Sequence, residues 1–267
     1  MMNYSTAKLA FVALLAFSIL FPTSSALGIR GAIITEEVSP GQELLHVITV
    51  GSREGEAPLN LTAEVFGFRR TDDGVNVEIS PDDDTGPYTA RPFLSIEPKS
   101  FTLEPGDQRS LLLTGTVPED VGSGGRYAIV TISTVPSSED GVAITFALQS
   151  IILLTIKDSD LLMTGEVSDL AASMSDGNVS VDLLLENTGN VHYTPLFGAV
   201  LLDEAGDIVA EQKPEVMTGV ILPTNSRLVK MTLAPEAELE PGTYTVEATV
   251  ALDDGTVLAA EETTIEV

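Results

Sequence analysis

The segment Phe93–Ile156 is FLSIEPKSFTLEPGDQRSLLLTGTVPEDVGSGGRYAIVTISTVPSSEDGVAITFALQSIILLTI. Runs of β-branched and aliphatic residues are separated in it by Pro-Gly, Gly-rich and Asp-Gly breaks. This spacing is typical of antiparallel strands in a β-sandwich, where short turns join strands of five to ten residues. The segment carries no catalytic motif, so it predicts a binding or structural module.

The same pattern continues on both sides of this segment. Upstream of the polar residues Lys157-Asp158-Ser159-Asp160, the predicted strands are Leu44–Val50, Leu59–Arg69, Val75–Ser80, Phe93–Ile96, Ser110–Val117, Tyr127–Val135 and Val142–Ile156. Downstream, Val179–Glu186 and Thr243–Val250 alternate apolar and polar residues, as strands with one buried face do. The predicted fold class is all-β, with two tandem immunoglobulin-like β-sandwich domains after an N-terminal signal peptide.

Residues 1–26 carry the features of a secretory signal peptide. A short polar start with Lys8 precedes the apolar run Leu9–Phe21, and small residues follow at Ser24 and Ala26. The apolar run is shorter than the ~20 residues that span a bilayer, although an uncleaved anchor stays open as the alternative. The predicted domains are therefore 1–26, 27–157 and 158–267, in a secreted protein, extracellular or periplasmic, that is not inserted in the membrane after cleavage.

The composition narrows the classes of function. The chain has 40 acidic and 13 basic residues, and its net charge of −27 argues against nucleic acid and anionic lipid as partners. It has no cysteine and no tryptophan, and its two histidines, His46 and His192, fit neither a zinc-site spacing nor a nucleophile elbow. We therefore predict that the protein is not an enzyme.

Two groups of acidic residues are candidates for a metal site. Hard oxygen ligands suit calcium, and such ligands occur in the loop Asp82, Asp83 and Asp84 and, at the domain joint, in Asp158 and Asp160. Neither group has the EF-hand spacing, so solvated turns are the alternative. No cofactor is predicted, with calcium as the possible exception.

Residues 29–156 resemble the first domain of periplasmic pilus chaperones. The resemblance rests on Val38–Glu43 before one strand, Ile96–Gly106 before another, the YAIVTISTVP strand at Tyr127–Pro136, and Phe146–Ser150. It implies an immunoglobulin-like sandwich whose last strand pairs with an extended segment of a partner. In that family two basic residues anchor the partner's terminal carboxylate. Here Glu36 stands at the first position, and no base follows Leu148-Gln149 before Lys157.

The second domain carries phrases that are common in sandwich domains of surface proteins, Asn187-Thr188-Gly189-Asn190 and Pro241-Gly242-Thr243-Tyr244. In the first phrase, Asn and Gly are expected to stabilise a turn after a core strand.

Two functions remain open. The first is a structural or adhesive component of the envelope that recognises envelope or surface proteins; the second is a chaperone-like assembly factor that binds subunits by strand pairing. The predicted partner-binding residues are Ile151, Ile152, Leu153 and Leu154, because their strand is apolar on both faces. Coverage of that second face by the second domain is the alternative.

Overall fold

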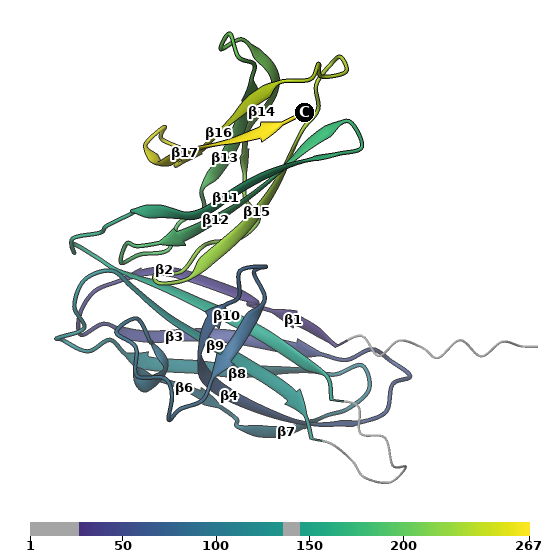
Figure 1. The fold of residues 1–267 in the computed structure, drawn as a ribbon. Coiled ribbons are helices and arrows are strands. Elements are labelled where there is room, and N and C mark those ends of the chain that lie inside the picture. Colours follow the sequence, from purple (N-terminus) through teal and green to yellow (C-terminus); the bar gives the residue numbers. More distant parts are fainter. Residues whose placement is uncertain (1–26, 136–144) are drawn as a thin grey trace, which may run out of the picture.

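The computed structural model describes residues 27–135 and 145–267, and these residues form two β-sandwiches (Figure 1). The signal peptide predicted at 1–26 and the start of the strand predicted at 142–156 lie outside the described residues. Within the described residues, the helical structure is one 3₁₀ turn, Arg91–Phe93, and no helix there is long and apolar enough to cross a membrane.

The first sandwich packs two sheets with the strand orders β1-β3-β8-β6 and β2-β10-β9-β4-β5, and β7 also pairs with β4. Most predicted strands are found within a few residues of their predicted ends, but β1, β2 and β7 were missed because they are short or carry acidic residues. The strands are β1 (Gly28–Arg30), β2 (Ile33–Val38), β3 (Glu43–Gly51), β4 (Leu59–Arg70), β5 (Asn76–Ile79), β6 (Leu94–Glu97), β7 (Ser100–Leu103), β8 (Gln108–Thr116), β9 (Gly125–Thr134) and β10 (Ala147–Ile156).

Strand β9 lies between two apolar clusters, one on each face of its sheet. Ala128, Val130 and Ile132 point into the core between the two sheets. Tyr127 and Ile129 point to the opposite face, because side chains alternate along a strand. Nearly all of β9 is therefore buried.

The second sandwich packs the sheets β11-β12-β15 and β14-β13-β16-β17. The predicted alternation is confirmed in β12, where every second residue from Val179 to Leu185 is fully buried. The strands are β11 (Gly165–Ser175), β12 (Asn178–Asn187), β13 (Leu196–Leu202), β14 (Ile208–Val216), β15 (Ser226–Leu233), β16 (Thr243–Ala251) and β17 (Val257–Glu266). The predicted fold class, two tandem β-sandwiches, is thus confirmed.

A short segment, residues 157–164, joins β10 to β11, and the two sandwiches also touch beyond it. Leu222, from the loop before β15, packs with Phe68, Tyr127, Ile129 and Leu153 of the first sandwich. We call the contact region between the sandwiches the seam. At the seam, the second sandwich covers part of the outer face of the β2-β10-β9-β4-β5 sheet (Figure 1).

Candidate functional site

The last strand of the first sandwich, β10, has one edge that is only partly paired. Residues 151–156 pair in parallel with β2, from Ile33 to Val38. Residues 147–150 pair with β9 on the other edge. Within residues 27–135 and 145–267, no strand pairs with the β2-side edge of residues 147–149. We call this stretch the open edge.

The backbone direction shows which groups the open edge presents. The Phe146 carbonyl accepts the Thr134 N–H of β9 at 3.0 Å, whereas the Ile151 N–H points the opposite way and donates to Ala32 O at 2.8 Å. Because neighbouring residues of a strand direct their N–H and C=O groups to alternate edges, those of Ala147 and Gln149 face the open edge. These groups form a short template for another extended chain.

Side chains at the open edge differ between the two faces. Leu148 packs against the core of the sandwich, and Phe146, just before the strand, is 40% exposed. On the outer face, Gln149 Nε2 donates to Glu78 Oε1 at 3.3 Å. A chain added here would therefore meet apolar side chains on the core face and polar ones on the outer face.

The predicted partner-binding residues Ile151, Ile152, Leu153 and Leu154 lie next to the open edge, but the structure does not present them as a free surface. Ile152 and Leu154 belong to the core of the first sandwich. Ile151 and Leu153 face the other way and pack in the seam. Strand β2 covers the edge of these residues and the second sandwich covers part of their outer face, which is the alternative that the sequence analysis left open. Partner binding by these four residues stays a prediction.

The positions aligned with the basic anchors hold no cation, as the sequence indicated. Glu36 lies in β2, where its Oε1 accepts Gln42 Nε2 at 3.0 Å and its Oε2 lies 2.9 Å from His46 Nε2. Across the strand pair its neighbour is Leu154. A carboxylate bound at this place would be repelled by Glu36.

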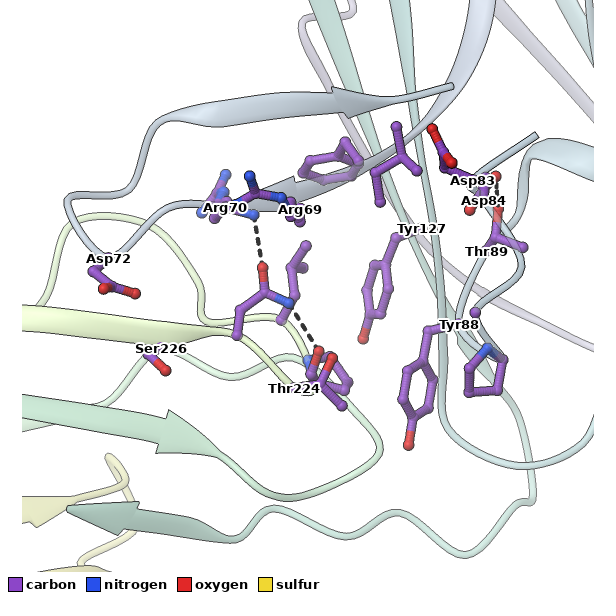
Figure 2. A pocket seen from close by; sticks show the side chains of 17 residues that line it. Arg69, Arg70, Asp72, Asp83, Asp84, Tyr88, Thr89, Tyr127, Thr224 and Ser226 are labelled. Atoms are coloured by element: carbon purple, nitrogen blue, oxygen red, sulfur yellow. Dashed lines mark hydrogen bonds between the residues drawn. The ribbon is translucent and has the colours of Figure 1, made fainter. Parts of the chain in front are cut away.

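A cleft of about 440 Å³ lies along the seam, between the two sandwiches (Figure 2). Its apolar lining includes Phe68, Tyr88, Tyr127 and Leu222. The Arg70 side chain spans the seam, since its Nη1 donates to Val220 O at 2.8 Å. No sequence pattern pointed to this cleft, because its walls come from segments that are far apart in the chain.

The Tyr127 hydroxyl makes a polar contact across the seam. It accepts the backbone N–H of His192 at 2.8 Å and lies 3.2 Å from His192 Nδ1. Burial raises the pKa of Tyr127, and burial with a smaller effect of Arg70 lowers the pKa of His192 to about 4. Both side chains are therefore neutral near pH 7.

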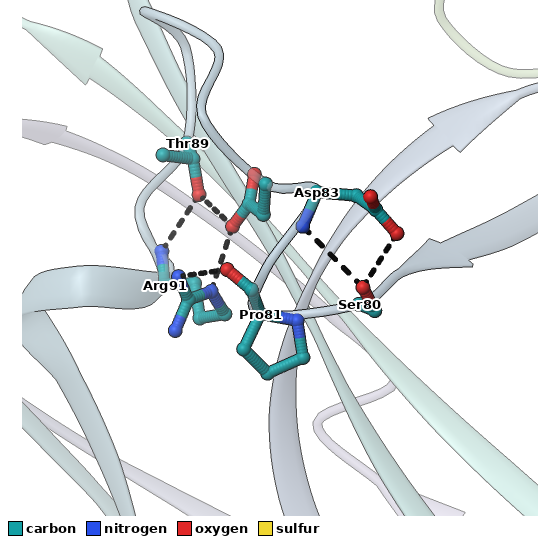
Figure 3. Close-up of polar contacts among 6 residues, drawn as sticks. Ser80, Pro81, Asp83, Thr89 and Arg91 are labelled. Carbon is teal, nitrogen blue, oxygen red and sulfur yellow. Dashed lines mark hydrogen bonds and ion pairs between the residues drawn. The ribbon is translucent and has the colours of Figure 1, made fainter.

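The acidic residues proposed for calcium do not gather into a ligand set. The carboxylate of Asp84 is buried, and its Oδ2 accepts Arg91 Nε at 2.8 Å and Thr89 Oγ1 at 2.6 Å (Figure 3). Asp83 instead accepts the Ser80 hydroxyl at 2.6 Å, and Asp82 is exposed.

Asp158 and Asp160 are exposed in the segment between the sandwiches. In the described part of the chain, no three His, Cys, Asp or Glu side chains lie close enough together to hold a metal ion. Calcium binding by these residues therefore stays a prediction.

The described residues form a pair of immunoglobulin-like β-sandwiches. No family model matches the chain, and no curated protein matches it. Similar solved structures include a chaperone–tip adhesin complex of CFA/I fimbriae biogenesis, with 14% identity, 86% of this chain and 96% of that chain covered, and a TM-score of 0.45.

Two further structures are similar at the same level. The Class 5 fimbriae chaperone CfaA has 12% identity, covers 90% of this chain and 98% of its own, and has a TM-score of 0.43. The complex of the Salmonella enterica SafA pilin with the SafB chaperone has 13% identity and a TM-score of 0.41. The match covers 90% of this chain and 96% of that chain. Identities of 12–14% bear on the fold and not on the function.

Proposed function

We propose that this protein is a chaperone-like, non-enzymatic binding protein of the cell envelope that holds an extended segment of a partner protein along the open edge. The observation that carries the proposal is the change in pairing along β10, which β2 covers at residues 151–156 and leaves uncovered at residues 147–149. An added strand would continue the sheet from the end of β2. Backbone hydrogen bonds would supply affinity, and the alternating faces would supply specificity.

The open edge favours this function over a structural or adhesive component, because such a component needs no unpaired strand edge and an uncovered edge carries a risk of aggregation. The partners we propose are envelope proteins that expose an extended segment, and the similar complexes contain a tip adhesin and a pilin as the chaperones' partners. With Glu36 in place of a base, this protein would hold its partner through the strand ladder and the apolar contacts of Phe146 and Leu148. The proposed location is periplasmic or otherwise outside the cytoplasm.

The absence of cysteine from the sequence makes the proposal directly testable. A single cysteine introduced as Ala147→Cys can carry a photocrosslinker, and Asp254→Cys, in an exposed turn of the second sandwich, serves as the positional control. In a native envelope extract, we expect the label at position 147 to crosslink a distinct protein within an extended segment. Identical products from both positions would contradict the proposal.

A pair of substitutions then separates backbone pairing from side-chain contact. Gln149→Pro removes an N–H that faces the open edge, whereas Gln149→Ala removes the side chain and keeps that N–H. Since each backbone hydrogen bond contributes about 1 kcal/mol and the proline ring obstructs the approaching strand, we expect the crosslink yield to fall about tenfold or more for Gln149→Pro. Gln149→Ala should stay close to wild type. Equal yields from the two folded variants would rule out strand pairing at this edge.

A further inference from the structure

The turn between β12 and β13, residues 187–192, connects three parts of the molecule at one end of the seam. Asn190 holds the joining segment, with Oδ1 accepting the Leu162 N–H at 2.8 Å and Nδ2 donating to Asp160 O at 2.8 Å. Its carbonyl accepts the Gly125 N–H of β9 at 2.8 Å. The turn therefore ties the second sandwich both to the joining segment and to the first sandwich.

His192 completes this contact through Tyr127. The hydroxyl oxygen of Tyr127 accepts the His192 backbone N–H, so its single proton is available for Nδ1 of the His192 ring. The two rings meet edge to face, with centroids 5.6 Å apart. Nδ1 can accept that proton only while the imidazole is neutral. We call the contacts of Asn190 and His192 with β9 the clasp.

The surroundings of His192 disfavour a positive charge. The ring is largely buried, and the charged group that acts on it is Arg70 of β4, itself a cation. Arg126 precedes Tyr127 on β9. The electrostatic interaction with Arg126 lowers the pKa of Tyr127, and that with Tyr88 raises it, both less than burial does. On the joining segment, Asp160 contributes its backbone carbonyl, which Asn190 Nδ2 contacts. A protonated His192 would thus be a largely buried cation under the influence of the Arg70 cation, and the Tyr127 proton would lose its acceptor.

We propose that the clasp is an acid-released joint, in which protonation of His192 frees the β12–β13 turn from β9 and lets the two sandwiches change their relative angle. The joining segment stays intact. The β4–β5 hairpin remains as a second tether, since Leu228 N–H donates to Asp72 O at 2.8 Å and Arg70 N–H donates to Asn225 Oδ1 at 2.6 Å. The cleft of the seam lies between this tether and the clasp residue Tyr127, so its shape changes with the angle.

The direction of the pH dependence follows from the lowered pKa of His192. A histidine that is neutral in the clasped state strengthens that state above its free pKa of 6.5, and this contribution falls as the pH drops from 6.5 towards about 4. The difference between these two pKa values corresponds to a rise of up to about 300-fold in the ratio of released to clasped molecules. Near neutral pH the clasped state is favoured.

The experiment measures the distance between two spin labels, one on each sandwich, in the full chain. Ser110→Cys and Asp254→Cys place the labels at exposed positions, with no other cysteine present. For otherwise unchanged protein we expect one narrow distance distribution at pH 7.5 and a broader or shifted one at pH 4. The transition should reverse when the pH is raised again.

Two variants assign the transition to the clasp. His192→Asn keeps the backbone N–H and an acceptor oxygen but does not titrate, so its distribution should stay narrow at pH 4. Tyr127→Phe removes the shared hydroxyl and should broaden the distribution at pH 7.5. Circular dichroism at each pH confirms that the sandwiches remain folded. If His192→Asn opens at the same pH as the parent, or if the folded parent stays narrow at pH 4, the proposal is overturned.

Discussion

Replacing Asn187 with alanine should lower the free energy of unfolding of the second sandwich by about 3–5 kcal/mol. The Asn187 side chain is fully buried at the end of β12, and it makes three hydrogen bonds to backbone groups. Nδ2 donates to Val191 O at 2.9 Å and to Ile221 O at 3.0 Å, while Oδ1 accepts the Gly189 N–H at 2.9 Å. Alanine would leave the Val191 carbonyl and the Gly189 N–H buried without these partners, while the Ile221 carbonyl keeps the Tyr193 N–H at 3.4 Å. Each buried group without a partner costs about 1–3 kcal/mol.

Urea unfolding followed by circular dichroism measures this effect. The matched control is Asn60→Ala, because Asn60 is exposed and its Oδ1 accepts a single side-chain bond, from Thr102 at 2.9 Å. That substitution should change the free energy of unfolding by less than about 1 kcal/mol. A similar small loss for Asn187→Ala would show that the turn is not held by its side chain.

Replacing Asp84 with alanine should destabilise the first sandwich by about 3–5 kcal/mol. The Asp84 carboxylate is 4% exposed and its partner Arg91 is 23% exposed, so removal of the carboxylate leaves a largely buried cation unpaired. Thr89 loses its acceptor at the same time. The carboxylate also fills the space beside Gly67, where a Cβ atom would lie 2.3 Å from it, so the substitution opens a gap in the packing.

The neighbouring acidic residue provides the control for Asp84. Asp82→Ala, at an exposed position of the same loop, should have almost no effect on thermal unfolding. The double variant Asp84→Ala with Arg91→Met should recover part of the lost stability, since it removes the unpaired cation. Equal melting temperatures for Asp82→Ala and Asp84→Ala would contradict a stabilising role for the ion pair.

Asn187 and Asp84 show which features of the structure the sequence predicted and which it did not. The phrase Asn187-Thr188-Gly189-Asn190 predicted a turn after a core strand, and the Asn187 to Gly189 hydrogen bond confirms it. The sequence did not indicate that Gly189 lies against the joining segment, where a Cβ atom would be 2.0 Å from Leu162 O. That approach continues the pairing of β11 with β12, since Thr188 N–H donates to Thr164 O at 3.1 Å, and it joins segments more than 20 residues apart that no local pattern brings together.

In the loop Asp82, Asp83 and Asp84, by contrast, the sequence did not predict the directions of the side chains. Three adjacent carboxylates indicated hard oxygen ligands, but ion binding requires that they point to one place. Asp84 turns inward because Arg91, seven positions further on, supplies a buried partner, while Asp82 stays in solvent. Adjacent residues in a loop are close along the chain, yet the direction of each side chain depends on what packs around the loop.

The sequence by itself determined the two sandwiches and their buried faces, because period-two alternation and turn residues act over a few positions. It also indicated that residues 151–154 are apolar on both faces. Only the tertiary structure decided what covers them. Strand β2 completes the edge of residues 151–156, the second sandwich covers Leu153, and residues 147–149 are left as the open edge. Those outcomes depend on contacts between segments more than 60 residues apart, whose free energies are set by the assembled fold rather than by local propensity.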